Sequence, residues 1–119
     1  NHLIALVTML GAVGTAATES SVPLASGRYV FEHRFAEHPS MPSISVDVVI
    51  NGSRIVISNP AQSNPFPAGV LAQGQLMQHA GSAQWIIGND ESDRWAEDVG
   101  GCSDGPEVVD LAAKIYWTC

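Results

Sequence analysis

Apolar side chains recur at every second position along several stretches of this chain. In residues 28–36, one face carries Tyr29, Phe31, His33 and Phe35, and the opposite face includes charged side chains. A period of two is typical of a β-strand with one buried face, because successive side chains of a strand point to opposite sides. We therefore expect residues 28–36 to form a half-buried strand.

Residues 44–58 carry the clearest pattern in the chain. Four β-branched residues share one face before Asn51-Gly52, and a second apolar run, 54–58, follows. Asn-Gly is a preferred central pair for a type I′ turn, which joins two antiparallel strands. The stretch therefore predicts a tight β-hairpin that turns at Asn51-Gly52.

Further strands are expected beyond this hairpin. The segment 59–69 contains three prolines, so we expect a loop in which Phe66 packs onto the core. Strands are predicted at 70–79 and 84–88. Gly74 lies inside the first of these two strands and suggests a β-bulge or a bend.

The N-terminal residues differ from the rest of the chain. Residues 3–17 form an apolar run of 15 that ends in small residues, which is typical of a secretory signal peptide and short for a membrane span. We expect residues 1–17 to be a signal peptide, 18–26 a linker and 27–119 a single domain. The alternative for the apolar run is a buried helix or strand of the domain itself. The first interpretation predicts a secreted or periplasmic protein with no membrane span after cleavage.

Export changes the interpretation of the two cysteines. In an oxidising compartment Cys102 and Cys119 can form only one bridge within the chain. The bridge would close a loop of 18 residues and add about 3 kcal/mol by restricting the unfolded chain. The bridge also limits the conformation of the segment between the two cysteines. Eleven steps from Val108 to Cys119 in a straight strand would span about 36 Å, far more than the chain before Val108 can return.

The segment 107–119 must therefore bend, and two bent structures fit it. A hairpin that turns near Ala112-Ala113 would bring Cys119 back towards Cys102. A helix over about 106–116 is the alternative, because apolar side chains also follow the spacing i, i+3, i+4 and i+7. The β-branched and aromatic content of the segment favours the hairpin.

Together these elements predict an all-β fold. We expect an antiparallel meander of about six to seven strands that forms a small barrel or a strongly bent sheet, with one disulfide. The alternative is an α+β fold with a C-terminal helix. Gly27-Arg28-Tyr29, at the head of the first strand, is similar to the Gly-x-Trp start of lipocalins and their calycin relatives, with Tyr in place of Trp. This resemblance implies a cup-shaped barrel that could hold a small apolar ligand.

The charge of the chain limits its partners. Twelve acidic residues against five Lys and Arg give a net charge of −7, which would repel a phosphate backbone, so nucleic acid is not an expected partner. Eight of the acids fall between residues 90 and 110, where Arg94 is the only Lys or Arg. This uneven distribution suggests either a solvated loop or a surface for a cationic partner.

No catalytic site, metal or cofactor is expected. Gly101-Cys102-Ser103-Asp104-Gly105 matches the Gly-x-Ser-x-Gly string of a nucleophile elbow, but no histidine follows Ser103 in the chain. His33, His38 and His79 match no spacing that is typical of metal ligands. We therefore expect a protein that is not an enzyme.

Two non-catalytic functions remain. The first is the binding of a small apolar molecule in the barrel, in a cavity lined by Tyr29, Phe31, His33, Phe35, Trp85 and Trp117. The second is an acidic protein-interaction domain, for example an inhibitor of a cationic secreted enzyme such as lysozyme. Its contact surface would comprise Asp90, Glu91, Asp93, Trp95 and Asp98.

Overall fold

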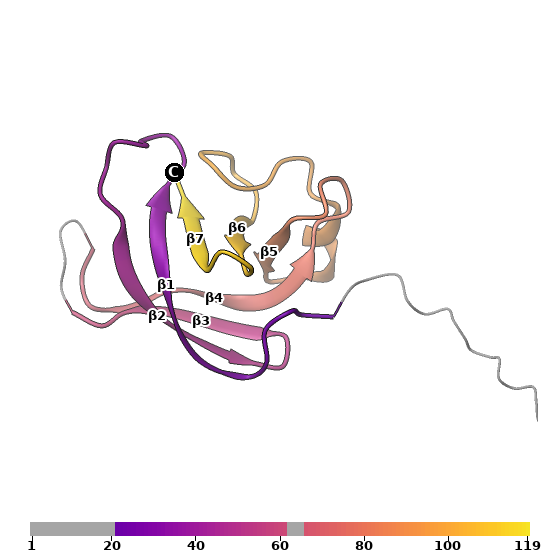
Figure 1. The fold of residues 1–119 in the computed structure, drawn as a ribbon. Helices are drawn as coiled ribbons and strands as arrows, with labels where there is room; N and C mark the ends of the chain where they lie inside the picture. Colours follow the sequence, from indigo (N-terminus) through magenta and orange to yellow (C-terminus); the bar gives the residue numbers. More distant parts are fainter. Residues whose placement is uncertain (1–20, 62–65) are drawn as a thin grey trace, which may run out of the picture.

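The computed structural model describes residues 21–61 and 66–119, and this part of the chain forms a closed β-barrel of seven strands (Figure 1). The strands are β1 (Gly27–Phe35), β2 (Ile44–Asn51), β3 (Arg54–Asn59), β4 (Gly69–Gln78), β5 (Trp85–Gly88), β6 (Glu107–Asp110) and β7 (Ile115–Thr118). A short 3-10 helix, η3 (Glu91–Trp95), follows β5. The predicted all-β fold with one disulfide is confirmed. The expected signal peptide, 1–17, lies outside the described residues.

Neighbouring strands follow the order of the sequence, and all consecutive pairs are antiparallel. The pair that closes the barrel, β1 and β7, is parallel and aligns Glu32–Phe35 with Ile115–Thr118. This follows from the odd number of strands, because the first and last strands of such a meander run in the same direction. Figure 1 shows β7 beside β1, with the C-terminus at the end of both strands.

The β2–β3 hairpin is confirmed, but its turn lies one residue later than predicted. Asn51 pairs with Arg54 as the last pair of the ladder, which leaves Gly52 and Ser53 as the two turn residues. A type I′ turn needs positive φ at both central residues. Here Gly52 has φ of +65°, whereas Ser53 does not have positive φ. Glycine alone therefore takes the left-handed conformation.

The expected bulge in β4 is also displaced. The register shifts between Ile57 and Ser58 of β3, whose partners are Ala72 and Val70, so Leu71 is the extra residue. Gly74 has a different role. A Cβ atom at this position would lie 2.6 Å from the carbonyl oxygen of Gly88 and 2.9 Å from Ile87 Cγ2. The missing side chain thus lets β5 pack closely against β4.

The C-terminal segment forms a hairpin, and the alternative helix over 106–116 is wrong. Strands β6 and β7 pair through Val109–Tyr116 and Asp110–Ile115. The Asp110 side chain accepts a hydrogen bond of 2.8 Å from the Ala113 backbone in the turn. The returning strand places Cys119 beside Cys102, with 4.6 Å between their Cα atoms in the disulfide. A helix would not reverse the chain direction and return Cys119 to Cys102. The β-branched residues of the segment also fit strands better than a helix.

Buried side chains fill the middle of the barrel. Every strand contributes at least one member to a single cluster, and burying each large apolar side chain contributes about 1.5–3 kcal/mol. The cluster comprises Phe31, Val46, Val48, Ile50, Ile55, Ile57, Leu76, Ile87, Val109, Leu111 and Tyr116. The interior is therefore packed in the part of the chain that is described.

A smaller apolar cluster lies on the opposite face of β4, β5 and β6. It consists of Met77, Ile86 and Val108, and Val99 and Trp117 pack against it. Each of the three buried members is adjacent in sequence to a residue of the central cluster, so the two sets point to opposite sides of the strands. Val99 comes from the loop after η3, which therefore covers the outer face of the barrel there.

The described part of the expected linker, 21–26, lies against the barrel. Val22 and Leu24 pack on the central cluster. The backbone N–H of Gly52 donates a hydrogen bond of 2.8 Å to the Ser26 hydroxyl. Among the described residues, the structure has no helix that combines the length and hydrophobicity needed to cross a membrane.

Replacing Gly74 with Ala should lower the free energy of unfolding by about 1–3 kcal/mol. Alanine is normally better than glycine in a strand by about 0.5–1 kcal/mol. The contact with the Gly88 backbone should outweigh this gain, because a backbone atom cannot move aside as a flexible side chain can. Urea denaturation would measure the change. Gln73→Ala, at the exposed neighbouring position, is the control and should change stability by less than about 0.5 kcal/mol.

Candidate functional site

The structure separates the six residues that were expected to line a cavity. Tyr29, Phe31, His33 and Phe35 share the inward face of β1 as predicted, and the last three are buried. Trp85 packs against the same central cluster from β5, whereas Trp117 packs against the smaller outer cluster. The six residues therefore do not line one common space.

His33 is the centre of an aromatic cluster near one end of the barrel. Its side chain is only 1% exposed, and its ring centroid lies 4.6 Å from that of Phe35, 5.0 Å from Phe66 and 4.7 Å from Tyr116. Nε2 shares a hydrogen bond of 2.8 Å with the Thr118 hydroxyl. Nδ1 is buried without a partner in the described chain. Burial lowers the pKa of His33, so the ring is neutral at physiological pH.

Glu107 and Tyr116 form a second polar contact beside this cluster. The Tyr116 hydroxyl donates a hydrogen bond of 2.7 Å to Glu107 Oε1 across the β6–β7 hairpin. Burial raises the pKa of Glu107, although the bond from Tyr116 partly opposes the effect. Burial, together with the adjacent carboxylate, raises the pKa of Tyr116. The carboxylate is thus less favourable in the folded chain than in water.

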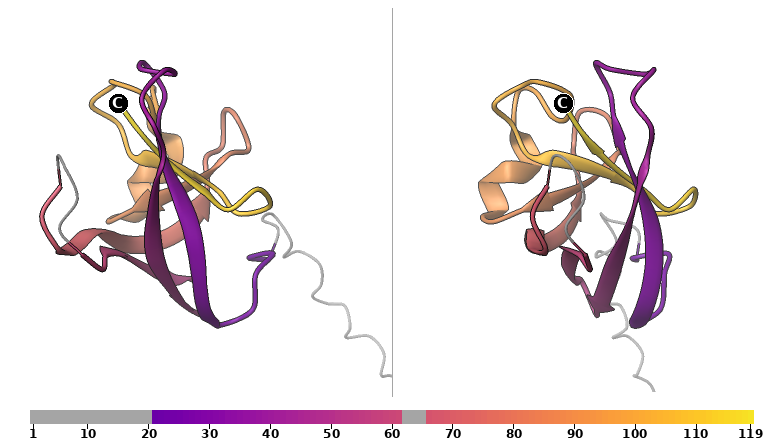
Figure 2. Two further views of the ribbon diagram at one scale, coloured as in Figure 1. Left: turned by 60° about the vertical axis from the view of Figure 1, so that its left-hand side comes forward. Right: turned by 90° about the vertical axis from the view of Figure 1, so that its left-hand side faces the viewer.

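Four of these residues, Phe35, Phe66, Glu107 and Thr118, border an open pocket at the end of the barrel, which we call the end pocket. Its volume is about 540 Å³. Its described lining residues come from the β1–β2 loop, from Phe66 before β4, from the loop before β6 and from the ends of β1, β6 and β7. Figure 2 shows the β1–β2 loop and the loop before β6 beside the C-terminus. The lining residues are Phe35, His38, Met41, Phe66, Gly100, Gly101, Cys102, Ser103, Gly105, Glu107, Thr118 and Cys119.

The strands and loops that hold the end pocket are fixed by specific contacts. The Asn59 side chain, at the end of β3, donates hydrogen bonds of 3.0 and 3.1 Å to the carbonyls of Phe66 and Pro67. Phe66 thereby stacks on Phe35, with the ring planes 5° from parallel. This confirms the expectation that Phe66 packs onto the core. On the other side, the disulfide joins the loop before β6 to the end of β7.

The Gly-x-Ser-x-Gly string lies in the same loop, where its serine forms hydrogen bonds with the backbone. The Ser103 hydroxyl donates a hydrogen bond of 2.7 Å to the Gly100 carbonyl. It also accepts one of 3.2 Å from the Gly105 N–H. Both contacts stabilise a turn, so this hydroxyl has a structural role in the described chain.

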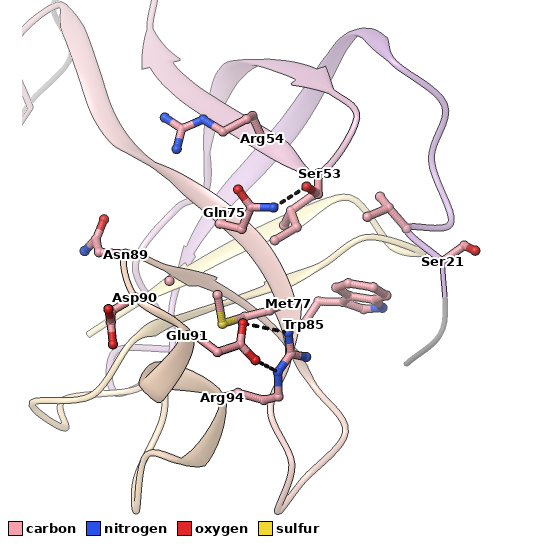
Figure 3. Close-up of a pocket in the computed structure, with 13 residues that line it drawn as sticks. Ser21, Ser53, Arg54, Gln75, Met77, Trp85, Asn89, Asp90, Glu91 and Arg94 are labelled. Carbon is pink, nitrogen blue, oxygen red and sulfur yellow. Dashed lines mark hydrogen bonds and ion pairs between the residues drawn. The ribbon is translucent and has the colours of Figure 1, made fainter. Parts of the chain in front are cut away.

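A second, more polar cleft of about 490 Å³ lies on the side of the barrel (Figure 3). Glu91 and Arg94 form an ion pair of 2.7 Å on one side, and the Gln75 side chain donates a hydrogen bond to Ser53 on the other. Trp85 and Met77 supply apolar surface. Most of the remaining lining groups are polar, so water can hydrate them as readily as a ligand can bind them.

The acidic residues that were expected to face a partner are largely bonded within the chain. Asp90 caps η3 and accepts hydrogen bonds from the backbone and hydroxyl of Ser92, which lower the pKa of Asp90. Asp93 accepts bonds from the N–H groups of Asn89 and Asp90. Trp95 is different, because 70% of its surface is exposed. Asp98 is exposed as well. The protein-interaction function therefore stays a prediction.

Comparisons with known proteins give no match, since no protein-family model, curated protein or solved structure matches this chain. The closed barrel is compatible with the lipocalin resemblance of Gly27-Arg28-Tyr29. Lipocalin barrels have eight strands, one more than the seven found in the described chain. The structure therefore supports a small closed β-barrel as the class of this domain.

Sequence reasoning did not identify Glu107, Met41 or Thr118 as residues of a site. Glu107 was counted with the acidic stretch, although it stands two residues before Val109 in a strand. The period of two could have placed its side chain on the inward face with Val109. Thr118 ends β7 and alternates with Tyr116 in the same way. Met41 carries no such signal, because the conformation of the β1–β2 loop brings it to the end pocket.

Replacing His33 with Gln should make the stability of the protein less sensitive to acid. The unfolded histidine takes up a proton near pH 6.5, whereas burial lowers the pKa of the folded one. The wild type should therefore lose stability as the pH falls below about 6.5 towards the lowered pKa, by at most about 1.4 kcal/mol per pH unit. Urea denaturation between pH 7.5 and 5.5 measures this slope.

The control for this experiment is His38→Gln, at an exposed position. It should retain the pH dependence of the wild type. Parallel curves for the wild type and His33→Gln would contradict a neutral, buried role for His33.

Proposed function

We propose that this protein is a secreted or periplasmic, non-catalytic binding protein that holds a small, mostly apolar molecule in the end pocket. The observation that carries the proposal is the composition of this pocket. Phe35, Met41 and Phe66 supply apolar surface, and Glu107 and Thr118 supply polar groups. Ligand pockets typically have volumes of about 300–1,000 Å³ and combine apolar surface with a few polar groups.

Because the middle of the barrel is packed, the end pocket is a better candidate binding site than an interior cavity. Phe31 is 1% exposed and belongs to the central cluster, so a ligand there would have to displace close-packed side chains. At the end of the barrel the loops leave about 540 Å³ without such a displacement. Of the residues that were expected to line a cavity, Phe35 borders the end pocket, and His33 lies behind Phe35 and Thr118.

The disulfide supports the proposed location. Cys102 and Cys119 are both exposed in the described chain. An exposed disulfide persists in an oxidising compartment and is open to reduction in the cytosol. The same bridge holds one wall of the end pocket, so export and ligand binding would depend on a common feature.

A neutral fluorescent probe of apolar sites, N-phenyl-1-naphthylamine, should bind the protein with one site. Met41→Asp should weaken its binding at least fivefold, because an ionised carboxylate in the pocket wall must lose water when the probe binds. Met41 is 41% exposed, so the substitution should not disturb folding. Fluorescence titration measures both affinities.

Val30→Asp is the matched control, because Val30 is 62% exposed on the outer face of β1. It should bind the probe as the wild type does. Equal weakening by both variants would place the probe elsewhere. If the probe does not bind, and native mass spectrometry of protein purified from its own host finds no adduct, the proposed function is wrong.

A further inference from the structure

We propose that the ligand of the end pocket carries an organic ammonium group, and that the Glu107 carboxylate and the Phe35–Phe66 pair bind this cation. The inference rests on the proposed function, because it names the chemical class of the molecule held in that pocket. Three independent features of the pocket support it: its charge, its aromatic geometry and the incomplete hydrogen bonding of Glu107.

The charge of the end pocket favours a cation. No Lys or Arg lies among its described lining residues, and Glu107 and His38 are its titratable side chains. Arg34 lies near this end of the barrel, but its guanidinium group is paired with Glu32 at 2.5 Å on the outer face. The Glu37 carboxylate approaches the pocket wall, 3.7 Å from where a Cβ of Gly101 would lie. A cationic group would therefore meet negative potential there.

Two aromatic side chains line the end pocket, and Phe66 is more exposed than the buried Phe35. The rings of Phe35 and Phe66 are nearly parallel, with centroids 6.0 Å apart, and both residues line the end pocket. The face of an aromatic ring attracts a cation, and such contacts are worth about 0.5–2 kcal/mol depending on desolvation. Aromatic rings beside a carboxylate can bind both the apolar and the charged part of an organic ammonium ion.

Glu107 has a carboxylate oxygen available for the cation. Tyr116 donates its hydrogen bond to Oε1, and Oε2 has no hydrogen-bond partner in the described chain. Burial without full compensation also raises the pKa of this carboxyl group. Oε2 is not among the described side-chain atoms that are buried without a partner, so water reaches it and a ligand cation could take the place of that water.

A matched pair of probes tests the inference. Phenyltrimethylammonium and its neutral isostere tert-butylbenzene have nearly the same shape and differ in charge. Titrations followed by ¹H–¹⁵N NMR should show that the wild type binds the ammonium ion about tenfold more tightly. The largest shifts should fall on amides of the loop 100–105. Glu107→Gln should bind the two probes about equally and keep its affinity for the neutral one.

Glu97→Gln is the matched control, because it removes the same charge from an exposed position outside the end pocket. It should retain the preference for the ammonium ion. Glu107→Gln should also be at least as stable as the wild type at pH 7, because the amide oxygen can still accept the Tyr116 bond and a costly charge is removed. Urea denaturation at pH 7 confirms that this variant folds.

The outcomes separate the inference from the proposed function. Equal binding of both probes by the wild type, with shifts in the end pocket, would overturn the ammonium ligand and leave the binding function standing. A preference that survives in Glu107→Gln, or disappears in Glu97→Gln, would also overturn it. If neither probe binds, the inference is wrong, and the titration with N-phenyl-1-naphthylamine decides the proposed function independently.

Discussion

The closing contact between β1 and β7 is the constraint on which this barrel depends. An antiparallel meander with seven strands must close through a parallel pair, and only four residues of each strand are paired here. Parallel ladders are slightly less stable per residue than antiparallel ones. The Cys102–Cys119 disulfide reinforces this end of the barrel, because it holds the end of β7 to the loop before β6. Closure and the wall of the end pocket therefore share one covalent restraint.

Packing determines where a ligand can be held. The central cluster fills the barrel with large aliphatic and aromatic side chains and supplies stability, so the proposed ligand would be held by the loops at the end of the barrel. The residues at the end pocket and behind it include groups whose burial is unfavourable. His33 keeps a buried nitrogen without a partner, and Glu107 keeps a carboxylate whose pKa is raised by burial. The hydrogen-bond partners of the two groups, Thr118 and Tyr116, both lie on β7. Glu107 and Thr118 also line the end pocket.

The fold was largely predictable from the sequence, because strand periodicity is a local signal. The alternation in residues 28–36 and 44–58 predicted β1 and the β2–β3 hairpin, and the distance limit of the disulfide required the bend in 107–119. The position of the β2–β3 turn and the role of Gly74 were not predictable, because they depend on register and on contact with Gly88. The end pocket combines residues from three loops and three strands, so no sequence pattern marks it. The contact surface expected in the acidic stretch stays a prediction, and the bonds of Asp90 and Asp93 to the backbone around η3 could not be read from the sequence either.

Hydrogen exchange with and without a reducing agent tests the dependence of the closure on the disulfide most directly. The amides of Ala36 and Glu37 donate hydrogen bonds to the carbonyls of Thr118 and Cys119 across the closing contact. If the disulfide holds this contact, reduction should accelerate exchange at these two amides at least tenfold, while the amides of the β2–β3 hairpin change much less. Unchanged exchange at Ala36 and Glu37, or the same acceleration in the hairpin, would contradict the account.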